Sequence, residues 1–336
     1  MEKNRRADAV MFGFDFQINS AIVLMIENIK DLKSIRLESN EEDIKLTLND
    51  DSLVLAQAKA VREASWDFRN VRANINKALT TLSEQSKKKE VKQFIFITNS
   101  PNPFNDAGSR SVFYGHAHRK YSSLPPSAKK IVQDYLSKIE ESLDLEKLYI
   151  HVLPFETDDD TERYKVVMQV VNDFVGRIGA SLSPGIGEKL FKIWNYDVFK
   201  NGTKRDESIE LTKKSIVWPI VVIETDINRC EQSFLEQFDI GIYDEVVRVY
   251  ASIINSCCER MEFVTRVLFD YTQFNSSKTP RDKYNDFIES TWANYREDFA
   301  EEKIAEDVLE ALVKIILYNI IRRRYAIDKL KKEVNL

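Results

Sequence analysis

The chain has 336 residues, of which 43% are hydrophobic and 31% are charged, with only 9 glycines and 8 prolines. This composition is typical of a helix-rich globular protein with one large or two ordinary domains, and it excludes an extended flexible linker. The formal net charge of −5 excludes a protein that coats nucleic acid over its whole surface, although it permits a local basic groove.

Leader and membrane segments are not expected. Residues 1–6 are mostly polar and charged and lead into a mixed segment, unlike the apolar run of a secretory leader. The longest apolar stretch, residues 309–321, contains Glu310, Lys314 and Asn319. It is too short and too polar for a membrane span, which needs about 20 apolar residues. A buried helix explains this stretch better.

The three cysteines are Cys230, Cys257 and Cys258. They have no CxxC or Cys/His spacing, and adjacent cysteines rarely form a disulfide with each other. We therefore expect a cytoplasmic protein without a structural zinc site.

The N-terminal third predicts one helix followed by a hairpin-rich region. Residues 14–30 form a helix whose apolar residues recur at three- and four-residue spacing, and residues 34–38 form a short strand. Residues 43–48 alternate between apolar and polar side chains, and residues 49–51 give a turn signal. Residues 52–61 form a more apolar strand, which we expect nearer the centre of the sheet.

A second helix and a buried strand follow, at residues 71–85 and 92–98. The order helix, strand, strand, strand, helix, strand predicts a mixed α/β layer with helices available for both faces. Two further helices and two further strands are expected at residues 127–143, 160–178, 148–155 and 216–224.

From about residue 226 onward, only helices are expected, at about 242–272, 281–297 and 302–332. The predicted fold class is therefore α/β, a mixed sheet flanked by helices, followed by an all-helical C-terminal region. We place the first domain at residues 1–225 and the second at residues 226–336. Core packing explains most apolar residues of the second domain, and a face for docking partners or for self-assembly is the alternative.

Candidate chemistry lies in the predicted hairpin. If residues 49–51 form a tight turn, residues whose numbers sum to about 100 lie opposite each other, which places Asp43 beside Ala56 to Ala58. Gln57 and Lys59 are two residues apart and project from the same face of their strand. An acid, an amide and a lysine therefore meet at one edge of the sheet.

Such a set suits phosphodiester cleavage. A carboxylate holds a divalent cation, and a lysine orients the attacking water or stabilises developing charge. Magnesium suits a site made of oxygens, and the carbonyl of Ala58 offers a further backbone ligand. An ordinary hairpin with solvated charges is the alternative. Against it, Gln57 and Lys59 interrupt an apolar strand, where unpaired polar groups cost free energy.

Three segments together resemble a known family. They are Gly13-Phe14-Asp15-Phe16-Gln17, Leu37-Glu38 with Glu42-Asp43-Ile44, and Gln57-Ala58-Lys59. In this order they resemble the N-terminal PD-(D/E)xK endonuclease domain of CBASS effectors, which also occurs in Lamassu nuclease subunits and in nucleases paired with HerA-type ATPases. The chain is also similar in plan to Mrr-type restriction nucleases. The motifs span about residues 12–100, and the layout extends to about residue 225.

The resemblance implies a restriction-endonuclease-like fold and a role for each motif residue. Asp43 corresponds to the metal-binding acid of the second strand, Gln57 to the (D/E) position and Lys59 to the catalytic lysine. The implied cofactor is Mg²⁺, with Asp43, Gln57 and Ala58 as its ligands.

This sequence departs from the family at two positions. Gln57 is neutral where many relatives carry a carboxylate, and Gln17 stands where Mrr-like enzymes often place a helix glutamate. The site therefore has fewer negative charges than a two-metal site requires. Glu42, or Glu38 as the less favoured choice, is expected to supply the missing negative charge. The alternative is that both are ordinary turn carboxylates.

The implied function is that of the DNA-cutting subunit of a bacterial anti-phage defence complex, acting on double-stranded DNA. The C-terminal region is too short for the nucleotide-sensing SAVED domain of CBASS effectors, so control by a separate protein is expected. An SMC-like ATPase with a small helical subunit, as in Lamassu, is the first choice, and a HerA-type ATPase is the second. Homo-oligomers are compatible with this interpretation.

Two other classes remain open. A catalytically inactive assembly subunit that keeps the nuclease fold is favoured by the neutral Gln17 and Gln57. A nucleic-acid-binding module without cleavage predicts binding that weakens steeply with salt, and the acidic net charge speaks against it.

The histidines suggest little by themselves. His116 and His118 have the spacing of two side chains on one side of an extended segment, but no third ligand is near in the sequence. We expect surface or DNA-contacting residues there. His151 is expected to be a satisfied core histidine, and Glu27 lies away from the apolar stripe of its helix and is expected to be solvated.

Overall fold

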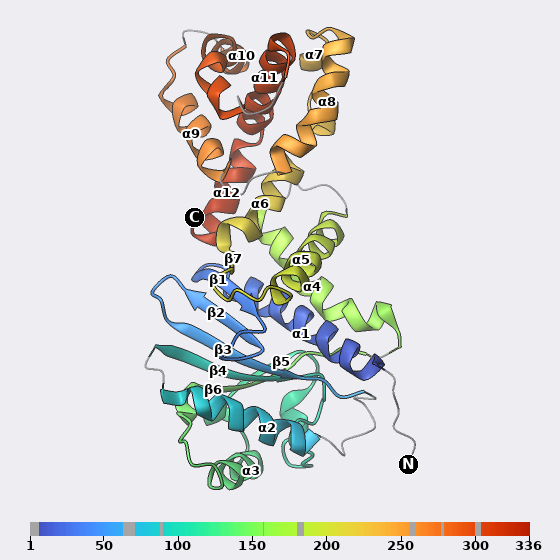
Figure 1. Ribbon diagram of the computed structural model, residues 1–336, viewed down its shortest axis with the longest axis vertical. Helices are drawn as coiled ribbons and strands as arrows, with labels where there is room; N and C mark the ends of the chain where they lie inside the picture. Colours follow the sequence, from blue (N-terminus) through green and yellow to red (C-terminus); the bar gives the residue numbers. More distant parts are fainter. Residues whose placement is uncertain are drawn as a thin grey trace. The chain divides into compact units, whose positions relative to one another are not determined.

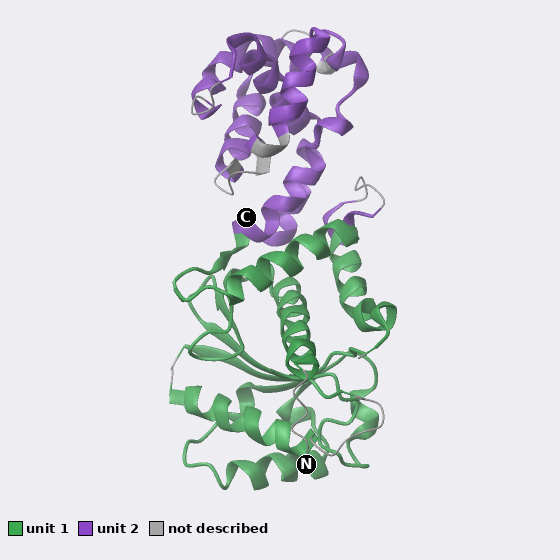
Figure 2. Cartoon of the chain, turned by 45° about the vertical axis from the view of Figure 1, so that its right-hand side comes forward, with its two compact units in different colours: residues 1–176, 187–213 green, residues 177–186, 214–336 purple. Residues whose placement is uncertain are grey.

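The computed structural model describes residues 7–62, 71–87, 90–156, 158–179, 185–255, 260–276, 279–299 and 304–336. Cys257 and Cys258 lie outside these ranges. The chain divides into two compact units, which are coloured separately in Figure 2. The first unit comprises residues 1–176 and 187–213, and the second comprises residues 177–186 and 214–336. The last division between the units, after Lys213, thus lies before the boundary at residue 225 that the sequence predicts.

The first unit is built on a mixed sheet (Figure 1). The described residues form seven strands in the order β5-β6-β4-β3-β2-β1-β7. Strands β3, β4 and β6 are parallel to one another, and all other neighbours are antiparallel. The bounds are β1 Leu32–Leu37, β2 Ile44–Leu48, β3 Leu53–Lys59, β4 Val91–Thr98, β5 Ala117–Lys120, β6 Leu148–Val152 and β7 Leu211–Thr212.

Helices cover the two faces of this sheet, as the sequence predicted (Figure 1). Helix α1 (Asp8–Glu27) packs on β1, β2 and β3. Helices α2 (Val71–Glu84) and α3 (Pro126–Leu136) close a core with apolar residues of β3, β4 and β6. The order helix, strand, strand, strand, helix, strand is therefore confirmed for α1 to β4.

Strand β4 lies in the middle of the sheet and has a parallel neighbour on each side. This position explains why its sequence is almost continuously apolar, since strands covered on both faces need hydrophobic side chains in both directions. Phe94 and Phe96 are each 1% exposed. Burial of such a side chain contributes about 1.5–3 kcal/mol to the free energy of unfolding.

Helix α1 is long and apolar enough to cross a membrane by length and composition, with a mean hydropathy of 1.7 in its most apolar window. However, 61% of that window is buried inside the protein, where the helix packs on the sheet. This burial is that of a core helix and is consistent with a soluble protein.

Two more helices complete the first unit, α4 (Asp160–Ile178), which runs on into the second unit, and α5 (Ile186–Gly202). They pack through Phe174 and Trp194, whose ring centroids lie 6.0 Å apart. After α5 the chain returns to β1, where Arg36 is only 1% exposed. The Arg36 guanidinium donates hydrogen bonds to the backbone carbonyls of residues 201, 204 and 209. A buried charge in β1 thus holds the segment that leads into β7.

The second unit is helical throughout its described residues, as expected for the C-terminal region. Helix α11 lies against α8, α9 and α10 and has 13 buried residues. The bounds are α6 Lys213–Glu224, α7 Gln232–Leu235, α8 Ile240–Asn255, α9 Arg260–Gln273, α10 Pro280–Thr291, α11 Glu306–Arg322 and α12 Arg324–Val334. Short 3-10 helices occur in the two units at Gln85–Lys87, Arg110–Phe113, Tyr121–Ser123, Leu145–Lys147, Ile227–Arg229 and Trp292–Phe299.

One predicted strand is wrong. Residues 216–224 form most of helix α6. Their run of β-branched side chains favours a strand, but Ile216, Val217, Ile220 and Val221 are buried at helical spacing. Burial on one side of a helix therefore outweighs the local propensity.

Some helix boundaries also differ from the expected ones. Helices α8 and α9 cover the described part of the long helix predicted at 242–272, and residues 256–259 between them lie outside the described ranges. The helix predicted at 127–143 ends at Leu136, and the last predicted helix is divided at Arg323 into α11 and α12.

Candidate functional site

The β2–β3 hairpin has the register that the sequence predicted. Ile44 lies opposite Ala56, and Lys45 lies opposite Leu55. The turn is tight because the backbone N–H of Asp51 donates to the carbonyl of Leu48 at 2.9 Å and Asp51 adopts a left-handed conformation, with φ of 61°. Asp tolerates this conformation better than most residues, so the turn sequence fits its geometry.

A second turn, between β1 and β2, carries most of the acidic residues of the site. The backbone N–H of Glu38 donates to the carbonyl of Asp43 at 2.8 Å, so these two residues lie opposite each other. The Ser39 hydroxyl accepts hydrogen bonds from the N–H groups of Glu41 and Glu42 and donates to the carbonyl of Glu42. Glu38 itself has φ of 53°, a conformation that costs free energy for a residue other than glycine.

Asp43 is held at the point where β3 extends beyond β2. Its Oδ2 accepts hydrogen bonds from the backbone N–H of Ala58 and from Lys59 Nζ, both at 3.0 Å. The side chains of Asp43 and Lys59 are 15% and 29% exposed, so this ion pair is partly shielded from solvent. The backbone N–H and carbonyl of one strand residue face the same neighbouring strand, so the Ala58 carbonyl also faces the Asp43 side.

Glu42 and Gln57 form the buried part of the site, with 3% and 5% exposure. Both carboxyl oxygens of Glu42 are buried and have no hydrogen-bond partner of ordinary geometry among the described residues. Burial raises the pKa of Glu42 to about 8; the amide of Gln57 opposes this rise, and the charge of Asp43 adds to it. Such a carboxyl group needs either a proton or a cation, because a bare buried carboxylate is strongly disfavoured.

Glu38 and Gln17 complete the cluster. Burial, followed by the charge of Asp43, raises the pKa of Glu38, while Lys59 and a hydrogen bond with the Gln17 side chain lower it. The structure thus brings Gln17 of α1, the acidic turn and the end of β3 to one place. Sequence reasoning ranked Glu38 below Glu42, because a residue at a strand end can point several ways and only the turn geometry fixes it.

The described residues do not form a cluster of three carboxylates at this place. Among them, only Glu27, His116 and His118 bring three ligand atoms of His, Cys, Asp or Glu within 4.8 Å of one another. A cation bound near Asp43 would therefore take amide, backbone carbonyl and water oxygens in addition to carboxylate oxygens, as Mg²⁺ commonly does.

The histidine-rich cluster differs from what the sequence suggested. Glu27 is the third potential ligand, which the sequence did not reveal because it lies far from His116 and His118 along the chain. It is exposed, as predicted, but its Oε1 also lies 3.3 Å from His118 Nε2. His151 is buried as predicted, but its Nδ1 has no hydrogen-bond partner among the described residues. The satisfied state predicted for it is therefore wrong.

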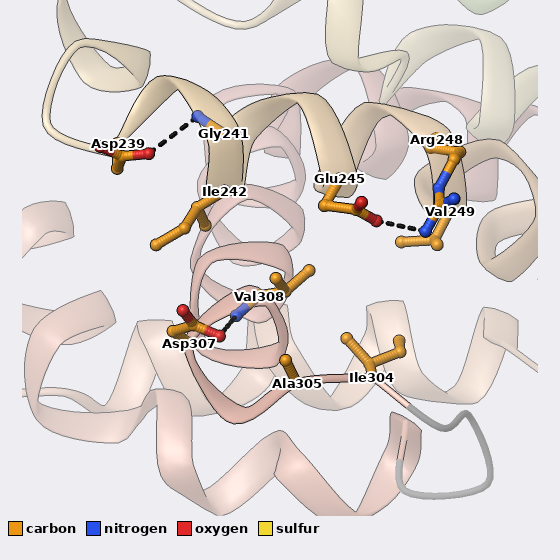
Figure 3. A pocket seen from close by; sticks show the side chains of 10 residues that line it. All are labelled: Asp239, Gly241, Ile242, Glu245, Arg248, Val249, Ile304, Ala305, Asp307 and Val308. Carbon is orange, nitrogen blue, oxygen red and sulfur yellow. Dashed lines mark hydrogen bonds and ion pairs between the residues drawn. The ribbon is translucent and has the colours of Figure 1, made fainter.

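A further pocket of about 530 Å³ lies in the second unit, between the start of α8 and the start of α11 (Figure 3). Its acidic side chains interact within their own helices or turns: Asp239 accepts from the Gly241 N–H, and Asp307 from the Val308 N–H. Glu245 forms an ion pair with Arg248 one turn along the same helix. This pocket therefore does not show the convergence of polar groups from several elements that marks the cluster around Asp43.

Comparison with protein families, with curated proteins and with solved structures gives no match for this chain.

Proposed function

We propose that the chain is a metal-dependent DNA endonuclease of the PD-(D/E)xK type. The observation that carries this proposal is the arrangement at the end of β3. Lys59 Nζ and the Ala58 N–H both contact Asp43 Oδ2, beside the buried carboxyl group of Glu42, which interacts with the neutral amide of Gln57 and forms no ion pair among the described residues. An ordinary solvated hairpin gives no reason for a buried carboxyl group at this position.

The order and direction of the elements also support the proposal. Helix α1 is followed by three antiparallel strands, helix α2 and a strand parallel to β3. This order, with Asp43 beside the start of β2 and Gln57 and Lys59 at the end of β3, supports the proposed restriction-endonuclease-like domain.

The residues present fit a single Mg²⁺ ion better than two. Asp43, Gln57 and the Ala58 carbonyl would hold it, and the neighbouring Glu42 would lose its proton and add negative charge once the ion is bound. When bound, Mg²⁺ supplies polarisation of the phosphate and a lower pKa for a bound water molecule. The amide of Gln57 in place of a carboxylate leaves too little negative charge for a second ion.

Lys59 is the residue of this chain that can stabilise negative charge on a phosphate. Its side chain is 29% exposed at the end of β3, where a phosphate can approach it from solvent. In that position it can donate a hydrogen bond to a phosphate oxygen or to the attacking water and stabilise the developing negative charge. Asp43 holds Lys59 in place until the substrate arrives.

The proposed biological setting follows from the resemblance alone. We propose a cytoplasmic effector subunit of an anti-phage defence complex that cuts double-stranded DNA and is restrained by partner subunits. An SMC-like ATPase with a small helical subunit is the preferred partner set, and a HerA-type ATPase is the alternative. The helical second unit is the part proposed to dock such partners or further copies of the chain.

A catalytically inactive assembly subunit is the second candidate. The neutral Gln57 at a position where relatives carry an acid favours it, as does the lack of a three-carboxylate cluster around Asp43 in the described residues. In this case the Asp43–Lys59 pair would serve only to close the end of β3.

Cleavage of supercoiled plasmid with Mg²⁺, by the chain alone and with its candidate partners, tests the two candidates. Asp43→Asn and Lys59→Ala are expected to lower the cleavage rate by about 100-fold or more, as removal of one stabilising donor does in other enzymes. Lys33→Ala is the matched control, because Lys33 forms an exposed ion pair with Asp51 on the same sheet. Equal cleavage by all four proteins, or none by the wild type with partners present, would favour the assembly subunit.

A further inference from the structure

All three histidines of the chain lie together in the first unit. His116 and His118 are at the start of β5, and His118 lies opposite His151 of β6 in the antiparallel pairing. The end of helix α1 brings Glu27 to the same place, with Oε1 at 3.3 Å from His118 Nε2 and 3.9 Å from His116 Nε2. The two histidine Nε2 atoms are 2.8 Å apart.

These three distances are close to those of a tetrahedral metal site. Zinc binds imidazole nitrogen at about 2.0–2.1 Å and carboxylate oxygen at about 2.0–2.2 Å, so two ligands at the tetrahedral angle lie about 3.4 Å apart. The distances between Glu27 Oε1, His116 Nε2 and His118 Nε2 are 2.8, 3.3 and 3.9 Å, which lie below, near and above this value. Small side-chain rotations would bring all three distances to it.

We propose that Glu27, His116 and His118 form a binding site for a divalent transition metal of the zinc class. Three protein ligands leave the fourth position to water or to a ligand from solvent. The side chains of His116, His118 and Glu27 are 24%, 33% and 28% exposed, so solvent can reach the cluster. The ligand set distinguishes this site from the one at Asp43, because imidazole suits zinc whereas Mg²⁺ prefers oxygen ligands.

His151 is an independent feature that supports the site. It is 5% exposed, its Nδ1 lacks a hydrogen-bond partner among the described residues, and its ring stacks on His118 with centroids 4.0 Å apart and an angle of 20°. A buried imidazole with an unused nitrogen, packed directly on a ligand, costs free energy that the fold alone does not explain. Its packing fixes the orientation of the His118 ring, as groups around metal ligands commonly do.

A bound ion would link the end of α1 to β5, two segments far apart along the chain, and would therefore stabilise the folded first unit.

The test uses the full chain freed of metal with a chelator. Co²⁺ is the probe, since its visible absorption reports tetrahedral coordination, and Zn²⁺ is then added to displace it. We expect one equivalent of Co²⁺ with a tetrahedral spectrum, displacement by Zn²⁺, and no displacement by excess Mg²⁺. Glu27→Gln, His116→Gln and His118→Gln should each weaken binding more than about 100-fold, because changes in the surrounding shell alone cost about 10- to 100-fold.

Two control variants separate this site from the rest of the molecule. Lys120→Gln lies on the same strand as His118 and forms a partly exposed ion pair with Glu146, so it should bind Co²⁺ like the wild type. Lys59→Ala should also bind normally, whatever its effect on DNA cleavage. Failure of the proposed nuclease activity therefore leaves this result intact.

Thermal unfolding provides a measurement that a merely misfolded variant would not reproduce. The wild type should melt at a higher temperature with Zn²⁺ than with chelator, and the three ligand variants should melt near the chelated wild type under both conditions. Absence of stoichiometric Co²⁺ binding by the wild type would overturn the proposal. So would unchanged binding in the three folded ligand variants.

Discussion

At the scale of single residues, Gln57 decides how much charge the site near Asp43 can hold. Gln57→Glu places a second buried carboxyl group beside Glu42, so without divalent ions the free energy of unfolding should fall by about 1–3 kcal/mol. With Mg²⁺ present, the added oxygen ligand should tighten Mg²⁺ binding about tenfold or more and recover the lost stability. Urea unfolding with chelator and with increasing Mg²⁺ measures both effects.

Gln93→Glu is the control for this change, since Gln93 lies near the start of β4, away from the site, and is only partly buried. It should give no Mg²⁺-dependent stabilisation. Equal Mg²⁺ dependence of Gln57→Glu and the wild type would mean that Gln57 does not face a cation site.

The sequence predicts part of this site for a simple physical reason. Asp43, Gln57 and Lys59 belong to one hairpin with a recognisable turn, so counting residues from the turn places them. Glu27 and the histidines come from segments without a shared turn, and only the paths of α1 and β5 bring them together. The signal in the sequence was the spacing of His116 and His118, which indicated two side chains on one side of an extended segment but gave no hint of Glu27.

At the scale of elements, α11 contains a buried charge that should make the second unit sensitive to alkaline pH. Lys314 is 8% exposed and forms ion pairs with Glu289 at 2.6 Å and Glu310 at 2.8 Å. Burial lowers the pKa of Lys314, but the hydrogen bonds and charges of the two glutamates raise it more, so that the pKa lies above its ordinary value of 10.5. The folded state thus holds the proton more tightly than the unfolded state.

Lys314→Ala should therefore lower the free energy of unfolding by about 1–2 kcal/mol at pH 7, because α11 loses the pair and the packing of the lysine stem. The difference from the wild type should stay constant up to about pH 10 and shrink as the pH rises through the folded-state pKa. Lys192→Ala, in the exposed pair with Glu188, is the control and should change stability by less than about 1 kcal/mol. A difference that grows above pH 10 would contradict the prediction. Urea unfolding at several pH values measures it.

Elements were easiest to predict where local pattern and burial agree. Helix α4 has the predicted bounds, and β4 differs by one residue, because the first is regularly amphipathic and the second is apolar and flanked by turn residues. The prediction of a strand at α6 is wrong because the β-branched residues of this segment suit a strand. The segment is a helix although Pro219 lies inside it. What decides its form is burial on one side, which only the packed unit provides.

At the scale of the whole molecule, the two units should unfold separately. Each has its own core, so urea or heat should give two transitions rather than one. Arg36→Met removes a buried donor from three backbone carbonyls, of which those of residues 201 and 209 keep the Lys204 N–H and the Asn201 amide as donors. It should therefore shift only the first unit's transition, by about 1–3 kcal/mol. Lys314→Ala should shift only the unfolding transition of the second unit.

Tryptophan fluorescence and circular dichroism during the same unfolding experiment distinguish the two transitions. Both units contain tryptophan, so variants that keep only Trp194 or only Trp292 report on the first and on the second unit. A single transition that both variants shift equally would show that the chain unfolds as one cooperative body. Added Zn²⁺ provides an independent assignment, since the proposed histidine site would move only the transition of the first unit.

The closing of β1 by β7 has a consequence for synthesis of the protein. Ser34 and Ile35 pair with Thr212 and Leu211, and the two terminal nitrogens of the Arg36 guanidinium donate to carbonyls of residues 201, 204 and 209. When only about the first hundred residues have been synthesised, the hairpin can form. The outer edge of β1 and the Arg36 guanidinium then still lack the partners that residues 201–212 provide. The nascent chain therefore carries an open strand edge for about half of its translation, the kind of surface that invites chaperones and aggregation.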